Sequence, residues 1–213
     1  MRLVRQLRGH VGFFKIGLEL FTACGPGVVA KARSEGEARI FLDLKFHDIP
    51  NTVAGAVRSA SALGVDLLTV HLAGGQVMLA AASAVVGPGT TLLGVSVLTS
   101  SSVETQRETG ADPDIGAQVR RLVTLGLQHG IRGFVASGHE VENLRRAFGR
   151  DILLVIPGVR PAWSVKADDQ SRVMTPEKAV AAGADFLVIG RPITGAADPA
   201  EAADRIAAEL ARG

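Results

Sequence analysis

Seven short apolar runs, separated by segments with helical spacing, constrain the fold of this chain more than any other feature. The runs are rich in Val, Ile, Leu and Phe and lack polar alternation, which is typical of strands covered on both faces. They occupy residues 11–17, 39–45, 66–71, 91–99, 133–137, 152–158 and 185–190. The pattern therefore predicts parallel strands that are connected by helices.

The intervening segments are Ala-rich and amphipathic, and they carry helix start and stop signals. Thr175-Pro176 and Asp198-Pro199 each pair a capping side chain with a proline suited to the first helical position. Three of the predicted helices are followed by a glycine, which readily adopts the left-handed backbone conformation that ends a helix: Gly64, Gly130 and Gly183. The predicted helices span residues 51–63, 75–85, 114–129, 139–148, 176–182 and 198–212.

The polar residues at the strand ends separate two candidate architectures, an open doubly wound sheet and a closed (β/α)8 TIM barrel. An open sheet gathers its site at one switch point, whereas a barrel draws it from many strand ends. Every run has a polar residue, a proline or a glycine at or just past its carboxyl end. Lys15, His71 and Ser137 are examples. We therefore predict one α/β barrel domain over residues 1–213, with the first β-strand of the eight missing from the chain.

Composition excludes several classes of protein. Lys and Arg outnumber Asp and Glu by only 23 to 21, and aromatic residues make up 4% of the 213 residues, so we expect no nucleic-acid binding. Charged residues interrupt the apolar N-terminal segment, so we expect no membrane span. A single cysteine, Cys24, permits no disulfide framework, and a reducing, cytoplasmic location fits best.

The segment "FLDLKFHD" places charges where a buried strand ends. Period-2 alternation sends Asp43 and Lys45 to the same face, Asp48 follows closely, and Lys15 ends the preceding strand. A structural ion pair is the plain alternative, but buried pairs rarely stabilise more than apolar packing does. An alternating set of two cations and two anions is therefore interpreted as a reaction site.

Two histidines lie near this segment, and neither predicts a metal centre. A lone histidine at a strand end, such as His71, is more often hydrogen-bonded structure than a catalyst, and the same holds for His47. No pair of His or Cys residues in the sequence has the spacing of metal ligands. We therefore expect no metal.

A phosphate site is predicted from the last two strands and their loops. In barrels these loops bind phosphate through backbone N–H groups and a short helix, and Arg191 after Gly190 adds a forked charge. The long loop between Gly158 and Thr175 contains Arg160 directly after the strand, and Gln170 further on. Long loops in compact domains commonly cover ligands, so we infer a phosphate monoester substrate closed over by a lid.

At these residues the chain resembles the bacterial-type orotidine 5'-phosphate decarboxylases. The matching segments run in order from about residue 11 to the C-terminus: "FFKIGLELF", "FLDLKFHDIPNTV", "VHLAGG", "VSVLTS", "IPGVRP", "DDQSRVMTP" and "LVIGRPIT". A bare D-x-K-x-x-D also occurs in related magnesium-dependent barrels, ketogulonate-phosphate decarboxylase and hexulose-phosphate synthase. The Ile-Pro-Asn-Thr extension and the Gly-Arg-Pro-Ile-Thr ending favour the orotidine enzyme.

The resemblance implies decarboxylation of orotidine 5'-phosphate (OMP) to uridine 5'-phosphate (UMP) in de novo pyrimidine biosynthesis, without cofactor or metal. Lys45 would donate a proton to C6 of the pyrimidine, and Asp43 would destabilise the substrate carboxylate. Lys15 would stabilise the developing negative charge with Lys45, and would also touch the ribose.

The resemblance also implies a homodimer in which Asp48, Ile49 and Thr52 reach into the partner's site. Other implied substrate contacts are Thr99 beside the pyrimidine and Pro157, with Arg160, Gln170, Gly190 and Arg191 on the phosphate side.

The family opens with a strand that ends in Leu-Asp, whose aspartate holds a ribose hydroxyl, and this chain has no such segment before "RLVRQLRGHVGFFKIG". Two alternatives to the decarboxylase stay open. One is a magnesium-dependent sugar-phosphate lyase with Asp43 as a metal ligand. The other is an N-terminally truncated, inactive chain that only binds uridine phosphates.

Overall fold

The fold is a series of parallel strands that follow one another in chain order and alternate with helices. The structure is a computed structural model that describes residues 1–36, 38–164 and 174–211. These residues group into two compact units, residues 1–95 with 125–131 and residues 96–124 with 132–213. Each unit is built from βα repeats of the predicted kind. The single-domain organisation stays a prediction.

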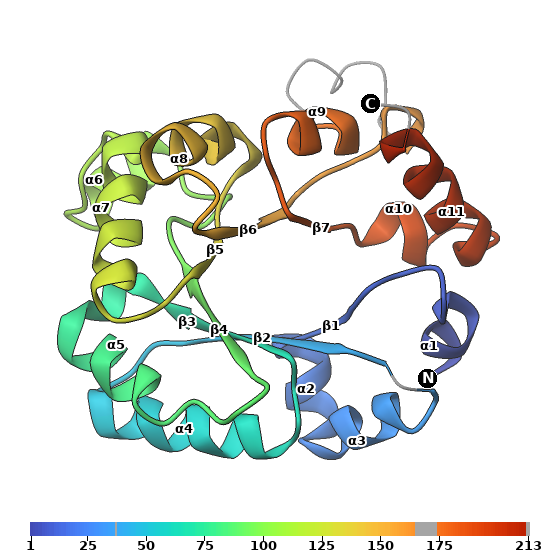
Figure 1. The fold of residues 1–213 in the computed structure, drawn as a ribbon, viewed down its shortest axis with the longest axis horizontal. Helices are drawn as coiled ribbons and strands as arrows, with labels where there is room; N and C mark the ends of the chain where they lie inside the picture. The colour runs from blue at the N-terminus through green and yellow to red at the C-terminus, as the bar shows by residue number, and fades with distance from the viewer. Residues whose placement is uncertain (37, 165–173, 212–213) are drawn as a thin grey trace. The chain divides into compact units, whose positions relative to one another are not determined.

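The residues described in the first unit form four parallel strands. Strand β2 pairs with β1 and with β3, and β3 pairs in turn with β4. Figure 1 shows helices α2 to α5 together on one side of these strands. The elements are α1 (Arg2–Leu7), β1 (Phe14–Gly17), α2 (Leu18–Cys24), α3 (Gly27–Arg33), β2 (Ile40–Phe46), α4 (Pro50–Ala62), β3 (Leu67–His71), η1 (Leu72–Gly74), α5 (Gly75–Ser83) and β4 (Thr91–Val95).

In the described part of the second unit there are three parallel strands, with β6 paired to β5 and to β7. Helices α8 and α9 lie on the same side of β6 and β7 (Figure 1). The remaining elements of the chain are α6 (Val103–Glu108), α7 (Ile115–Gln128), β5 (Gly133–Val135), η2 (Gly138–Glu140), α8 (Val141–Phe148), β6 (Leu153–Pro157), η3 (Ala162–Ser164), α9 (Pro176–Ala181), β7 (Phe186–Val188), α10 (Arg191–Thr194) and α11 (Pro199–Leu210).

Strands β2 to β6 are largely buried, as their apolar composition predicts, and β1 and β7 are less so. In β2, Ile40 and Leu42 are fully buried, as is Leu68 in β3, and helix α4 contributes Val57 to the same core. Phe134 of β5 and Leu154 of β6 take the equivalent place in the second unit. Burial of these side chains removes apolar surface from water and is the main stabilising contribution to each unit.

The predicted helix signals are confirmed. Thr175 accepts a hydrogen bond from the backbone N–H of Lys178, and Asp198 accepts from those of Ala200 and Glu201. Gly64, Gly130 and Gly183 have φ values of +74°, +78° and +110°, which a residue with a β-carbon adopts only at a cost. These caps fix where the corresponding helices begin or end.

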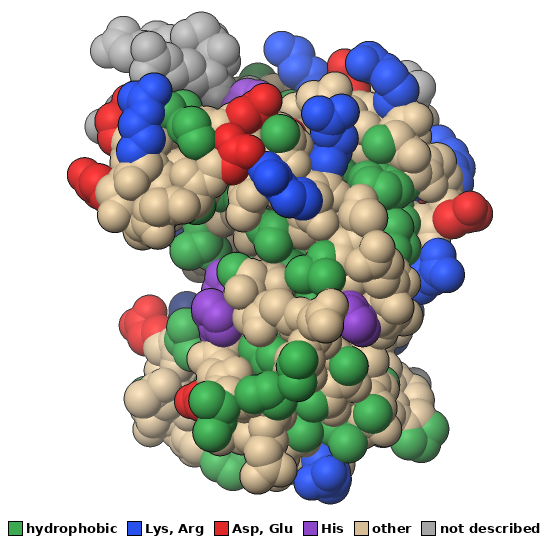
Figure 2. All heavy atoms as spheres, turned by 90° about the vertical axis from the view of Figure 1, so that its left-hand side faces the viewer, with side chains coloured by type: hydrophobic (Ala, Val, Ile, Leu, Met, Phe, Trp, Pro, Cys, Tyr) green, Lys and Arg blue, Asp and Glu red, His purple; other side chains and the backbone are tan. Residues whose placement is uncertain are grey.

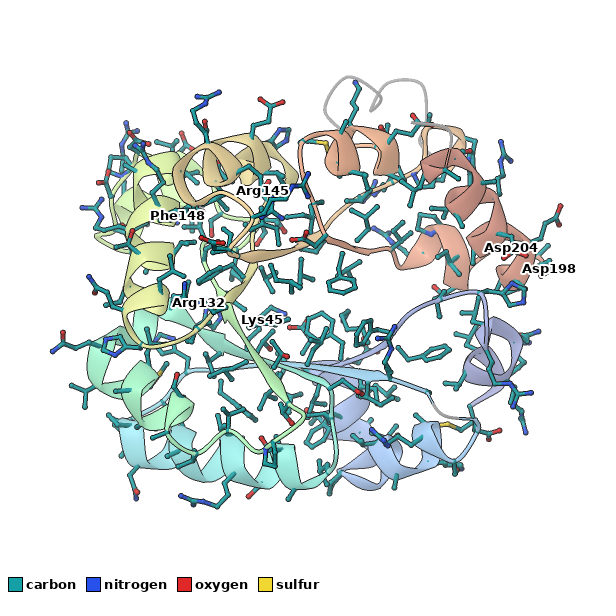
Figure 3. All side chains as sticks on the ribbon, viewed as in Figure 1. Lys45, Arg132, Arg145, Phe148, Asp198 and Asp204 are labelled. Carbon is teal, nitrogen blue, oxygen red and sulfur yellow. The ribbon has the colours of Figure 1, made fainter. Side chains whose placement is uncertain are left out.

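Two aspartates, each just before a strand, accept a backbone hydrogen bond from the neighbouring parallel strand. Asp66 accepts the backbone N–H of Ile40 at 2.7 Å, and Asp185 accepts that of Leu154 at 2.6 Å. Arg145 of α8 contacts Asp185 and donates to the carbonyl of Gly183 at 2.7 Å (Figure 3). A planar guanidinium with five donors suits such a junction of helix and strand.

Candidate active site

The centre of the candidate site is the carboxylate of Asp43, which lies between two lysines. Lys45 Nζ is 2.8 Å from both Asp43 oxygens, and Lys15 Nζ is 3.6 Å from Oδ2. The Asp43 side chain is 12% exposed, against 38% for Lys15 and 27% for Lys45. A nearly buried anion therefore holds two cations whose side chains are partly exposed.

Parallel pairing explains how the three side chains meet. Strand β1 aligns Lys15 with Phe41 and Gly17 with Asp43. Lys15 therefore lies two positions before Asp43 in the ladder, and its long side chain reaches the carboxylate of Asp43. Leu42 and Leu44 alternate with Asp43 and Lys45 and are buried, as period-2 geometry requires. Lys45 lies on the side of β2 away from helices α3 and α4 (Figure 3). The predicted shared face of Asp43 and Lys45 is thus present.

The backbone at Lys45 is unusual. Its φ of +51° is the one positive value among the described residues other than glycine. Such a conformation costs about 1–3 kcal/mol and persists only where the surroundings hold it. It coincides with a shift in the β2–β3 pairing between Leu42 and Phe46, and bulges of this kind redirect side chains beside active sites.

Sequence reasoning missed two residues of this site. Thr69, fully buried in β3, accepts the backbone N–H of Lys45 at 2.8 Å and donates its hydroxyl to Asp43 Oδ1 at 3.1 Å. Gly17 lies so close to Lys15 that a β-carbon there would come within 3.0 Å of the ammonium nitrogen. The one signal for Thr69 is a polar residue in the middle of the apolar run "LLTVH".

Asp48 does not join the Lys15–Asp43–Lys45 cluster within this chain. The sequence predicts that Asp48 is the fourth member of this set of charges. It is exposed, and its Oδ1 accepts the backbone N–H of Ile49 at 2.6 Å; in the described part of the chain it forms no ion pair. Strand β2 ends at Phe46 and α4 begins at Pro50, so Asp48 lies in the connection between them. Ile49 and Thr52 are exposed as well, Ile49 to 67%.

His71 and His47 form a ring pair beside Lys45, with centroids 5.5 Å apart. Burial lowers the pKa of His71, the neighbouring His47 and Lys45 lower it further, and Asp43 opposes them. These influences together favour the neutral form of His71 and lower its pKa. Among the described residues no group of three or more His, Cys, Asp or Glu side chains could hold a metal ion.

The second unit contains the residues predicted for phosphate. Pro157 ends β6, and half-buried Arg160 follows, its backbone N–H donating to the carbonyl of Met174 at 3.1 Å. Gly190 and Arg191, both exposed, begin the short helix α10, whose Ile193 and Thr194 N–H groups donate to the Gly190 carbonyl. Thr99 is exposed after β4. Gln170 lies outside the described residues.

Parallel strands that alternate with helices, with charged side chains at the carboxyl ends of the strands, are the arrangement of a β/α-barrel enzyme. The family model described as "Orotidine 5'-phosphate decarboxylase / HUMPS family" matches residues 1–206. The chain belongs to this family, so the predicted resemblance is confirmed.

Similar proteins cover nearly the whole chain. An orotidine 5'-phosphate decarboxylase of Syntrophotalea carbinolica is 51% identical over 98% of this chain and 88% of its own length. One of Moorella thermoacetica is 49% identical over 98% of this chain and 86% of its own length. The crystal structure of orotidine 5'-phosphate decarboxylase from Lactobacillus acidophilus matches with a TM-score of 0.82 at 35% identity, covering 98% of this chain and 93% of that one. These likenesses confirm the predicted fold class, the (β/α)8 TIM barrel.

No helix among the described residues has both the length and the apolar character needed to cross a membrane.

Proposed function

We propose that this chain is a carboxy-lyase that converts OMP to UMP and CO₂ in pyrimidine biosynthesis. The observation that carries the proposal is the Lys15–Asp43–Lys45 cluster in a chain of this family, with relatives at 51% and 49% identity that are named orotidine 5'-phosphate decarboxylases. The substrate supplies an anionic carboxylate, and the cluster supplies one anion and two cations.

In the proposed reaction the bond between C6 and the carboxylate breaks, CO₂ leaves, and the electron pair remains on C6. Asp43 lies next to the substrate carboxylate and raises its energy by like-charge repulsion. Lys45 and Lys15 stabilise the charge on C6 as it develops, and Lys45 donates its proton to C6. Solvent then returns a proton to Lys45. These steps use no metal and no cofactor.

The phosphate of the substrate is assigned to Arg160, Gln170, Gly190 and Arg191, with Pro157 and Thr99 as further substrate contacts. A guanidinium donates two parallel hydrogen bonds to phosphate oxygens, which fixes orientation as well as charge. Arg160 and Arg191 flank the ends of the last two strands, the usual place for phosphate in this fold class. The carboxyl ends of β6 and β7, which these two arginines follow, are adjacent because Pro157 pairs with Val188.

A homodimer with shared sites is part of the proposal. Asp48, Ile49 and Thr52 are exposed in a single chain, and we assign their side chains to the partner's site. Leu18, Leu20 and Val77 add exposed apolar surface to the first unit, and Figure 2 shows hydrophobic side chains gathered over the part of this unit that faces the viewer. Apolar surface of this kind is typical of an interaction site. The single exposed Cys24 is compatible with a cytoplasmic location.

The test is the fall of the OMP absorbance band on addition of the purified chain, with and without EDTA. Equal rates in both arms are the expected result. A rate that depends on added Mg²⁺, together with activity on a ketose phosphate, would instead support the sugar-phosphate lyase of the related barrels. UMP binding without turnover would support a chain that only binds nucleotides.

A further inference from the structure

Thr69 connects the two central residues of the candidate site. Its hydroxyl is 2.8 Å from the backbone nitrogen of Lys45 and 3.1 Å from Oδ1 of Asp43, and its side chain is fully buried. A backbone N–H can only donate, so the Thr69 oxygen accepts from Lys45. The single hydroxyl hydrogen is then available for the carboxylate, which can only accept. The direction of both hydrogen bonds is therefore fixed.

The pairing of β2 and β3 is irregular at the point where the Thr69 hydroxyl binds the backbone N–H of Lys45. Leu42 pairs with Leu68 and Phe46 pairs with Val70, so β2 advances four positions while β3 advances two. Within this interval the N–H of Lys45 is bonded to a side chain of β3, Thr69, and the residue has a φ of +51°. A buried N–H without a partner is strongly disfavoured, so the Thr69 oxygen supports the conformation that aims the Lys45 side chain at Asp43.

We propose that Thr69 is a positioning residue for decarboxylation, holding the Lys45 backbone and the Asp43 carboxylate in register through one hydroxyl group. The inference rests on the proposed roles of Lys45 and Asp43. Thr69 itself contacts no substrate in this proposal. It acts through the geometry of the two residues that do.

Replacement of Thr69 by Val retains the shape and removes both hydrogen bonds. Displacement of a reacting group by about 1 Å costs on the order of 100-fold in rate, so kcat for OMP should fall roughly 100-fold. KM should change less than about threefold, because the lost positioning matters in the transition state. Thr69→Ser keeps the hydroxyl and should restore kcat to within about threefold of the parent.

A control variant separates positioning from general stability. Thr90 donates its hydroxyl to the carbonyl of Val65 at 2.7 Å, at the opposite end of β3 and β4 from Lys45. Thr90→Val also loses a threonine hydrogen bond of the first unit, and its kcat should equal that of the parent. If Thr69→Val and Thr90→Val have the same kcat, the proposal is overturned.

A second pair of variants covers the case in which Thr69→Val does not fold. Thr69→Ala and Thr69→Ser both lack the methyl group and differ by one hydroxyl, so a kcat ratio near 100 between Ser and Ala supports positioning, and a ratio near one overturns it. Lys45→Ala, measured in parallel, tests the proposed function separately. If Lys45→Ala keeps full turnover, the roles of the cluster are wrong whatever Thr69 does. If Lys45→Ala is inactive and the Ser and Ala variants agree, only the positioning role fails.

Discussion

Lys45 donates to both carboxylate oxygens of Asp43 at 2.8 Å, although the two residues are only two positions apart on one strand. In a regular strand, such side chains stand side by side and point in the same direction. Here the ammonium group of Lys45 reaches both oxygens from a backbone with a positive φ of +51°. The pair presents a carboxylate and an ammonium group at one location, as the proposed decarboxylation and protonation at the same carbon would require.

The first prediction concerns Lys45. Lys45→Ala removes the proton donor and a stabilising cation together, so kcat should fall by at least about 10⁴-fold while UMP affinity changes far less. Steady-state turnover and UMP titration on the same preparation measure the two effects. Lys31→Ala, at the exposed end of α3, is the matched control and should behave as the parent. Turnover of Lys45→Ala within tenfold of the parent would rule out the central role.

The second prediction concerns the shared site. If Asp48 acts in the partner, inactive Lys45→Ala and inactive Asp48→Ala chains should recover activity when they are refolded together. A mixed dimer has one site with both lesions and one with neither, and about half of the dimers are mixed, so activity should approach roughly a quarter of the parent. Verified mixed dimers without turnover would show that Asp48 serves its own subunit or that the dimer is wrong.

The third prediction concerns Gly17. An added β-carbon would lie 3.0 Å from Lys15 Nζ, so Gly17→Ala should displace this ammonium from Asp43 and lower kcat/KM by roughly tenfold. The backbone φ of −97° is ordinary for alanine, so the fold should be retained. Gly27→Ala is the control, because no atom lies within 4 Å of its added β-carbon. Equal kcat/KM for the two variants would contradict the prediction.

The fourth prediction concerns the phosphate. Arg191→Ala should weaken UMP binding by roughly 10- to 100-fold, the worth of a charged hydrogen bond, and leave uridine binding unchanged. Calorimetric titration with both ligands gives the two affinities. Arg146→Ala, exposed on α8, removes the same charge and should change neither. An equal loss for UMP and uridine would mean that Arg191 does not contact the phosphate.

The fifth prediction is a pH dependence of stability. The pKa of His71 is lowered in the folded chain, chiefly by burial and then by His47 and Lys45. Below about pH 6.5 the unfolded chain therefore binds the proton more readily, and the free energy of unfolding should decrease as the pH falls from about 6.5 toward the lower folded pKa. Above that range the contribution is fully present.

Two variants test this dependence by urea unfolding between about pH 7.5 and 5.5. His71→Gln removes the titrating group and should flatten the curve. His47→Gln removes one of the causes, raises the pKa of His71 toward its usual value and should flatten the curve partly. Curves of the same slope for the parent and both variants would show that His71 does not cause the loss.

The sequence was sufficient wherever structure depends on neighbours along the chain. Apolar runs predicted all seven strands that the described residues form. Caps such as Thr175 and Asp198 placed the helix starts, because hydrophobic period and capping act over a few residues. Helices α2, α3 and α6 were not predicted, because six or seven residues are too few to establish a helical period. The alternation of Asp43 and Lys45 was readable for the same local reason.

Only the tertiary structure decided how the cluster is held. Thr69, Gly17 and the exposed position of Asp48 depend on how β2 aligns with β1 and β3, where four positions of one strand face two of the next. Sequence spacing cannot give this register, because a bulge adds residues to one strand without changing its apolar pattern elsewhere. The sequence alone thus determined which residues carry the charge, and the pairing of adjacent strands determined which hydroxyl and which glycine keep those charges in contact.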